Sequence, residues 1–399
     1  MKKLMILAVT VFALAACAKT YEVKETTPPA IGFGTWTDVL TKAITDPRAA
    51  GSNTFGVGDS FAVYGYKSAS DDTGKSTVFD DVAVEMTAAA VGADGGTWTY
   101  SPLRFWDKEY AKYTFFAVSP SSAGTGGTVD PQTGEVTSAS IVFAGNNNDI
   151  LVADKETVLK ANYNQKVQLD FNHVASLVDF KIAKASSLHD ATVKITSFTL
   201  ENIQTTGVLT VSSAYNATVY GGSAGPVATW SSTATGSYLP AAGVIPVYSN
   251  DGAGDNAISA THPLTIVEDD AFSVPAEPAD GKSTLIINNL VVKPQSFTAP
   301  ADRANPADAS NASAQKLTIS YTIEVTGGGS NSYTATLWLS DFDIVNNKSE
   351  VPNEETKVGS WDTGKYYKFY ITIDSTPIAF GASINNWVSG TTGYHYLVN

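Results

Sequence analysis

The chain has 399 residues, and its single cysteine stands where a thiol could accept a lipid. Cys17 closes the segment Leu14–Cys17 (LAAC), whose small residues suit a signal peptidase that cuts before a lipid-modified cysteine. Lys2 and Lys3 precede it, together with the apolar run Leu4–Leu14, which is shorter than the ~20 residues of a membrane-spanning helix. We therefore expect residues 1–16 to be a signal peptide and Cys17 to carry fatty acyl chains such as palmitate.

Residue types that could do catalysis are present, but their spacing does not suit catalysis. Gly221–Gly225 (GGSAG) matches G-x-S-x-G, yet Pro226 and the strand-like residues after it do not start the helix that a nucleophile elbow requires. The loops Asn146–Asp149 and Asn250–Asn256 offer oxygen ligands without the spacing of a calcium loop. The four histidines are scattered, never at metal-ligand spacing: His173, His189, His262 and His395. We expect no enzyme activity, no catalytic residue, no cofactor and no metal site, and a structural hydrogen-bonding role for His173.

Aromatic residues cluster in the segment Thr97–Lys108 (TWTYSPLRFWDK), and two interpretations of them are open. Rings such as Trp98 and Trp106 could stack against sugars if they were exposed. They could equally fill a sandwich core, because aromatic side chains bury large areas and favour strands. The core interpretation is the simpler of the two.

Charge excludes one class of partner. The chain carries 39 acidic and 25 basic residues, a formal net charge of −14. Nucleic acids and anionic membranes both require a basic surface, so we expect no nucleic-acid partner.

The body of the chain is patterned as short strands. Apolar alternation recurs in short runs separated by Gly, Asn, Asp and Ser clusters, and no long helical stripe interrupts it. This pattern predicts an all-β protein made of two antiparallel β-sandwich domains. The expected divisions are a lipidated tether (17–29), an N-terminal sandwich (30–187) and a C-terminal sandwich (188–399).

The first predicted strand has an unusual setting. Ile31–Val39 and Phe61–Tyr66 both resemble strands, and the segment between them is polar, contains Gly and Pro, and includes the basic residue Arg48. Exposed loops of this kind are where proteolysis concentrates. The strand could therefore fold into the domain and later be released by a cut after Arg48, so that residues 30–48 form a removable unit.

Several local motifs, in their order along the chain, resemble the fimbrillin family, the type V pilins of Gram-negative anaerobes. Residues 55–66 (FGVGDSFAVYGY) resemble the opening of that family. Residues 97–106 together with residues 113–120 resemble the next block of the family. Residues 167–181 (VQLDFNHVASLVDFK) resemble a third block. The ending Ala382–Trp387 resembles its close. The match spans nearly the whole chain and is strengthened by the lipid-acceptor motif.

This resemblance implies a mechanism. Family precursors look like two tandem transthyretin-like sandwiches, exported as lipoproteins to the outer membrane. An Arg-specific surface protease removes the first strand, and a strand from another pilin subunit fills the groove by donor-strand exchange, which builds an adhesive extracellular fimbrium. The matching cut here is Arg48-Ala49, and the expected donor is the tail Val388–Asn399. The partners implied are other pilin subunits, the protease, the lipid anchor, and ligands on host or bacterial surfaces. The alternative is a surface lipoprotein that does not polymerise and binds glycans through exposed aromatics.

Overall fold

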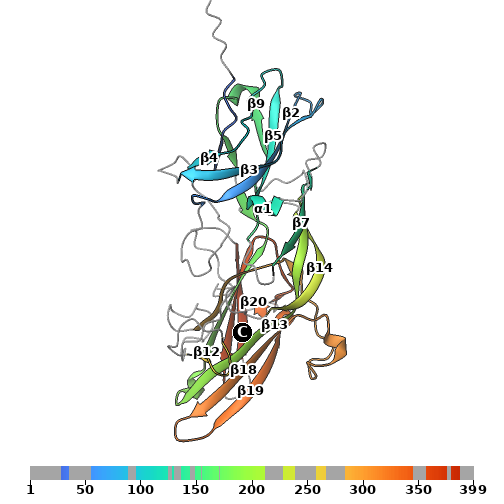
Figure 1. Ribbon diagram of the computed structural model, residues 1–399. Coiled ribbons are helices and arrows are strands. Elements are labelled where there is room, and N and C mark those ends of the chain that lie inside the picture. The colour runs from blue at the N-terminus through green and yellow to red at the C-terminus, as the bar shows by residue number, and fades with distance from the viewer. Residues whose placement is uncertain are drawn as a thin grey trace, which may run out of the picture.

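The computed structural model describes residues 28–35, 55–88, 96–124, 128–129, 136–143, 149–153, 155–169, 171–211, 228–238, 258–266, 284–344, 356–374 and 379–386. These residues form two β-rich lobes joined end to end (Figure 1). The predicted all-β class is confirmed: the only α-helix in this described part is the four-residue α1 (Ser121–Gly124). Short 3-10 turns lie at Lys160–Asn162, Ser186–Leu188, Ala309–Asn311 and Leu339–Asp341.

The N-terminal lobe is built on a seven-stranded sheet in the order β11-β8-β5-β2-β3-β4, with β9 also paired to β5. A two-stranded parallel sheet, β1-β10, packs with it around one aromatic core. The strands are β1 (Phe33–Thr35), β2 (Ser60–Ser68), β3 (Ser76–Ala88), β4 (Thr97–Thr99), β5 (Lys112–Ser119), β8 (Leu151–Ala153), β9 (Glu156–Leu159), β10 (Val167–Leu169) and β11 (Phe171–His173).

Strand β2 shows why the sheet is apolar on both faces. Phe61 and Val63 point into the aromatic core, whereas Ala62, Tyr64 and Tyr66 point to the opposite face and join a second cluster. A strand buried on both faces loses the usual alternation of apolar and polar residues, which explains the nearly continuous run FAVYGY.

The C-terminal lobe packs two sheets around a second large core. One sheet has the order β16-β12-β23-β24-β20-β21, and the other β19-β18-β13-β7-β6, with β14 and β15 also on β13. The first contains β12 (Ser176–Lys184), β16 (Thr284–Val292), β20 (Asp343–Ile344), β21 (Thr356–Lys357), β23 (Lys365–Ile373) and β24 (Ala379–Asn386). The second contains β6 (Thr128–Val129), β7 (Val136–Val142), β13 (Ala191–Val211), β14 (Ala228–Tyr238), β15 (Leu264–Thr265), β18 (Lys316–Val325) and β19 (Ser330–Trp338). A separate pair joins β17 (Gln295–Ser296) to β22 (Ser360–Trp361).

Most neighbouring strands are antiparallel, as expected, but β1-β10, β12-β23 and β20-β24 are parallel. Strand β12 precedes the predicted boundary at residue 187, yet it pairs with β16 and β23 of the C-terminal lobe. Strands β6 and β7 also pair into the second sheet of that lobe although they precede β8 in the chain, so no single cut divides the sheets. The domain boundary drawn from sequence stays a prediction.

Strand β13 is a single strand of 21 residues, whereas sequence patterning suggests two, Thr192–Leu200 and Val208–Val211. Its pairing with β14 shifts register three times between Leu200 and Gly207, and Asn202 has a positive φ of 62°. These bulges bend the strand, so its end leaves β18 and pairs with β7. The interruption in alternation is therefore a bend within one strand.

The bend encloses a lysine. Lys293 is 2% exposed, and its Nζ donates to Gln204 Oε1 at 2.5 Å and to the Pro294 carbonyl at 3.1 Å. Gly207 provides the space, because a Cβ there would lie 2.7 Å from Lys293 Cε. Burial lowers the pKa of Lys293 to about 8.

We expect this lysine to make stability depend on alkaline pH. Between pH 8 and the ordinary lysine value of 10.5, the unfolded chain binds a proton that the folded chain does not, so the free energy of unfolding rises with pH across that window, by ~3 kcal/mol. Urea unfolding of the native chain and of Lys293→Met at a series of pH values measures this. As pH rises through the window, the free energy of unfolding of the native chain should increase relative to that of Lys293→Met. Other titrating groups are common to both proteins and cancel in this comparison. Two parallel profiles would contradict it.

Candidate functional site

The N-terminal segment Pro28–Thr35 lies in a slot of the aromatic core and contacts both walls. On one wall, Ile31 N donates to the Arg104 carbonyl at 2.8 Å, and Trp106 N donates to the Pro29 carbonyl at 3.3 Å. On the same wall, the Tyr100 hydroxyl donates to the Ile31 carbonyl at 2.7 Å.

The other wall is β10. Phe33–Thr35 pairs in parallel with Val167–Leu169, and Val167 N donates to the Gly32 carbonyl at 2.8 Å. The segment is thus hydrogen-bonded on both sides, as an inserted strand is. Of the predicted strand Ile31–Val39, the described part is Ile31–Thr35, and only Phe33–Thr35 of it is assigned as strand.

The bulky side chains of this segment point into the core, and a glycine follows each of them. Ile31 and Phe33 are 1% and 2% exposed, and the two residues that follow them are Gly32 and Gly34. The side chains of Lys166 and Gln168 on the β10 side lie over these glycines. Bulky residues therefore face inward, and the glycines that follow them leave room for the side chains of Lys166 and Gln168.

Phe33 is the centre of an aromatic cluster. Its ring meets those of Phe79, Tyr100, Phe115 and Phe61 edge-on, at centroid distances of 5.4, 5.7, 5.9 and 6.2 Å. Edge-to-face contacts of this kind add ~0.5–1.5 kcal/mol each beyond the area they bury. Burial also raises the pKa of Tyr100, so its hydroxyl remains a donor to the Ile31 carbonyl over a wide pH range.

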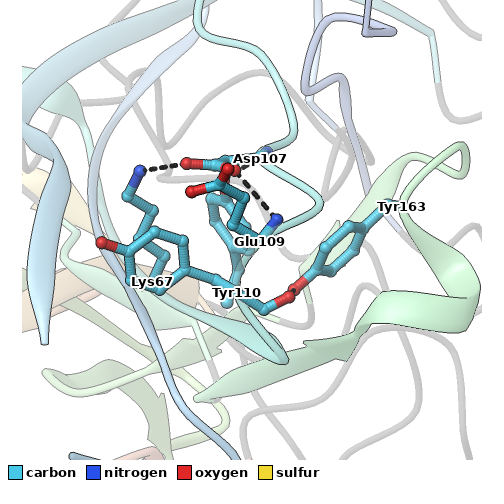
Figure 2. A network of polar contacts seen from close by, with 6 residues as sticks. Lys67, Asp107, Glu109, Tyr110 and Tyr163 are labelled. Carbon is cyan, nitrogen blue, oxygen red and sulfur yellow. Dashed lines mark hydrogen bonds and ion pairs between the residues drawn. The ribbon is translucent and has the colours of Figure 1, made fainter. Parts of the chain in front are cut away.

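A polar network fixes the loop that carries the first wall. Figure 2 shows Lys67 reaching Asp107, with Nζ 2.7 Å from Oδ2, and the same ammonium lies 4.2 Å from the centre of the Tyr110 ring. Glu109 N donates to Asp107 Oδ1 at 3.0 Å, and the Tyr163 hydroxyl donates to the Tyr110 carbonyl at 3.0 Å. The hydrogen bond from Lys67 holds the pKa of Asp107 below its usual range. Burial raises the pKa of Tyr163 to about 12.

The network also positions Trp106. Its ring stacks on Tyr163 at 4.8 Å and 8°, and meets Tyr113 at 4.9 Å. Trp106 is 1% exposed and Trp98 8% exposed. The core interpretation is confirmed for both tryptophans, and the sugar-platform interpretation of them is wrong, because neither offers a free ring face.

The other residues singled out in the sequence fall in separate places. His173 ends β11, and its Nδ1 lies 2.7 Å from Asp149 Oδ2, with both side chains buried. His189 N and His262 N bond within local turns. Cys17, Arg48 and Ala49 lie outside the described residues, as do the tail Val388–Asn399, the Gly221–Gly225 motif and the loop Asn250–Asn256. No cluster of metal-ligating residues occurs in the described part of the chain, and none of its helices is long and apolar enough to cross a membrane.

The residues that sequence reasoning missed are Tyr100, Arg104 and Lys67. Their contacts to Ile31 or to Asp107 join positions far apart in the chain. The motif Thr97–Lys108 marked the region but gave no sign of the partners.

Comparison with protein families identifies the chain. A family model described as Fimbrillin-like matches residues 41–387. The chain belongs to the fimbrillin-like family. As a fimbrillin it is a structural subunit of surface fimbriae that polymerises with other subunits, and not an enzyme.

One solved structure of similar fold supports the fold assigned to this fimbrillin. A fimbrial protein from Bacteroides vulgatus is 17% identical, with 90% of this chain and 99% of that chain covered and a TM-score of 0.51. The tip fimbrial protein Mfa3 from Porphyromonas gingivalis, with a C-terminal truncation, is 10% identical, with 90% and 100% covered and a TM-score of 0.33. No curated protein sequence matches this fimbrillin significantly.

Proposed function

We propose that the chain is a lipoprotein precursor of a fimbrial subunit, in which β1 is a temporary strand. The precursor is acylated at Cys17 and held at the outer membrane. Cleavage after Arg48 releases the segment that contains β1, and a strand from another subunit takes its place in the extracellular fimbrium.

The observation that carries the proposal is how the Pro28–Thr35 segment is held. Two of its side chains, Ile31 and Phe33, are buried, and burying each is worth ~1.5–3 kcal/mol. The body of the chain begins again at Phe55, which packs in the same core. The strand therefore stabilises the domain. It is joined to Phe55 by a chain segment that a protease could cut.

Release of the segment would leave a slot lined with unused hydrogen-bonding groups. The Arg104 carbonyl, the Tyr100 hydroxyl and Trp106 N would each lose a partner on one wall, and Val167 N would lose one on the other. Tyr100 and Arg104 would keep the hydrogen bonds between them. Unpaired backbone groups beside an apolar trench are a template for strand addition. A donor with bulky residues at alternate positions would restore both sets of contacts.

The sequence around Arg48 suits a protease specific for arginine. Asp46 and Pro47 precede it and the small residue Ala49 follows, in a segment without strand pattern, and Lys42 is the nearest competitor. The released segment 17–48 has as many basic as acidic residues, so its loss leaves the net charge unchanged. The cut removes the lipid and the strand together.

The proposed donor is the tail Val388–Asn399 (VSGTTGYHYLVN). Its flexible Ser-Gly-Thr-Thr-Gly start is followed by the aromatic and apolar run Tyr394–Val398. Such a run is an aggregation hazard in an isolated domain and is suited to pairing in another subunit.

Limited digestion of the purified precursor with an arginine-specific protease tests the proposal. We expect a product that begins at Ala49 and then forms SDS-resistant ladders, which Edman sequencing and unheated gels detect. Arg48→Gln should prevent both, and the matched variant Lys42→Gln should prevent neither. A precursor that is cut after Arg48 and stays monomeric would refute strand exchange, whereas ladders from Arg48→Gln would refute the cleavage site.

A further inference from the structure

Strand β19 is the long outer edge of the second sheet of the C-terminal lobe (Figure 1). It pairs with β18 from Lys316↔Trp338 to Glu324↔Ser330 without a register shift. Within the described ranges, no strand pairs with its other side, and its first five residues are exposed.

Strand β19 lacks the features that usually prevent an edge strand from pairing with another chain. Its nine residues, Ser330–Trp338 (SNSYTATLW), include no charge, no proline and no glycine. Natural edge strands are commonly kept short, bulged, or marked with lysine or proline, because a bare edge pairs with other chains. Of the other strands that end sheets, β4, β6, β11 and β21 are two or three residues long, whereas β16 has nine residues, as β19 does.

The face beside the edge is uncharged as well. Thr318, Ser320 and Thr322 of β18 lie opposite three β19 residues, Thr336, Thr334 and Ser332. The charges that border this hydroxyl patch are neutralised in pairs: Lys194 lies 2.7 Å from Glu324, and Lys316 lies 3.2 Å from Glu201. On a chain with 39 acidic and 25 basic residues, this is a surface where two copies can meet without like charges facing each other.

We infer that β19 pairs with β19 of a second copy of this chain, antiparallel about a two-fold axis near Tyr333. An isologous contact uses the same residues from both copies, so the strand must be complementary to itself. A strand without charges meets this condition, because no like charges lie opposite each other. Tyr333 is 43% exposed and stacks on Tyr321 at 5.4 Å, which places an aromatic contact at the axis.

This contact is lateral. It is independent of β1, Arg48 and the C-terminal tail, and it does not rest on the proposed strand exchange. It would join subunits of neighbouring fimbrial filaments side by side. Many weak contacts of this kind in parallel would give high avidity.

The test uses the chain without its signal peptide, not cleaved at Arg48 and carrying Cys17→Ser. Its association is measured by sedimentation velocity over a wide concentration range. We expect a reversible monomer–dimer equilibrium. The double variant Ser332→Lys/Thr334→Lys should weaken the dimer by about tenfold or more, and Ser332→Glu/Thr334→Glu likewise, because like charges then face each other across the axis. An equimolar mixture of the two variants should dimerise again, since opposite charges are then paired.

The matched control is Ser320→Lys/Thr322→Lys on β18. It adds the same charges to the same face, directly opposite Thr334 and Ser332 but one strand in from the edge. It should still dimerise, and circular dichroism should show that all variants are folded. The proposal is overturned if the unsubstituted chain is monomeric at every concentration, if the β18 control abolishes the dimer as fully as the β19 variant, or if the mixture fails to restore it.

Discussion

Replacing Phe33 by alanine is expected to lower the free energy of unfolding of the uncut precursor by about 3–5 kcal/mol. Phe33 is 2% exposed and meets four aromatic rings, so its truncation leaves a cavity that rigid neighbours cannot close. The ring of Phe115 is itself confined, because a Cβ on Gly65 would lie 2.9 Å from its Cδ1. Collapse of the slot is therefore restricted.

Urea unfolding followed by tryptophan fluorescence measures this effect. The matched control is Phe105→Ala, which removes the same side chain beside the same segment; Phe105 forms a bridge with Ala30 through its backbone and is 43% exposed. We expect the control to cost less than about 1 kcal/mol. After cleavage at Arg48, the Phe33→Ala protein should be indistinguishable from the native one, because residue 33 is gone. A small effect on the uncut chain would contradict the placement of Phe33 in the core, and a difference that persists after cleavage would contradict release of the strand.

Deleting Val388–Asn399 is expected to abolish SDS-resistant ladders after cleavage while the uncut chain keeps its free energy of unfolding. The physical reason is that the slot would be emptied but no donor strand would remain to fill it. The cut subunit, which has lost the burial of Ile31 and Phe33, should then unfold at lower urea concentration than the precursor.

Two full-length variants sharpen the result. Tyr394→Lys/Leu397→Lys keeps the length of the tail but places charges on its apolar run, and it should also stop assembly. Thr391→Ser/Thr392→Ser alters only the polar start and should assemble normally. Gels without heating score the ladders, and mixing deleted with native subunits should give short, terminated ladders. Undiminished ladders from the deleted chain would show that the donor lies elsewhere.

Local pattern in the sequence was enough for the all-β class and for most strand positions. Apolar patterning depends on neighbouring residues, so β5, β18 and β23 are visible from Tyr113–Val118, Leu317–Val325 and Tyr366–Ile373 alone. The order of motifs also identified the fimbrillin family. The export and lipidation signal at Leu14–Cys17 is local too, and it stays a prediction.

Long-range pairing was decided only by the tertiary structure. The slot for β1 joins Ile31 to Tyr100 and Arg104 on one side and Gly32 to Val167 on the other, and no local pattern records these contacts. The same holds for the buried faces of Trp98 and Trp106, and for the bend that makes β13 one strand. Aromatic residues favour strands whether they face a core or solvent, and a bulge interrupts alternation just as a loop does. Which strand is an exposed edge, as β19 is, likewise depends on sheet order, which is set by packing across the whole lobe.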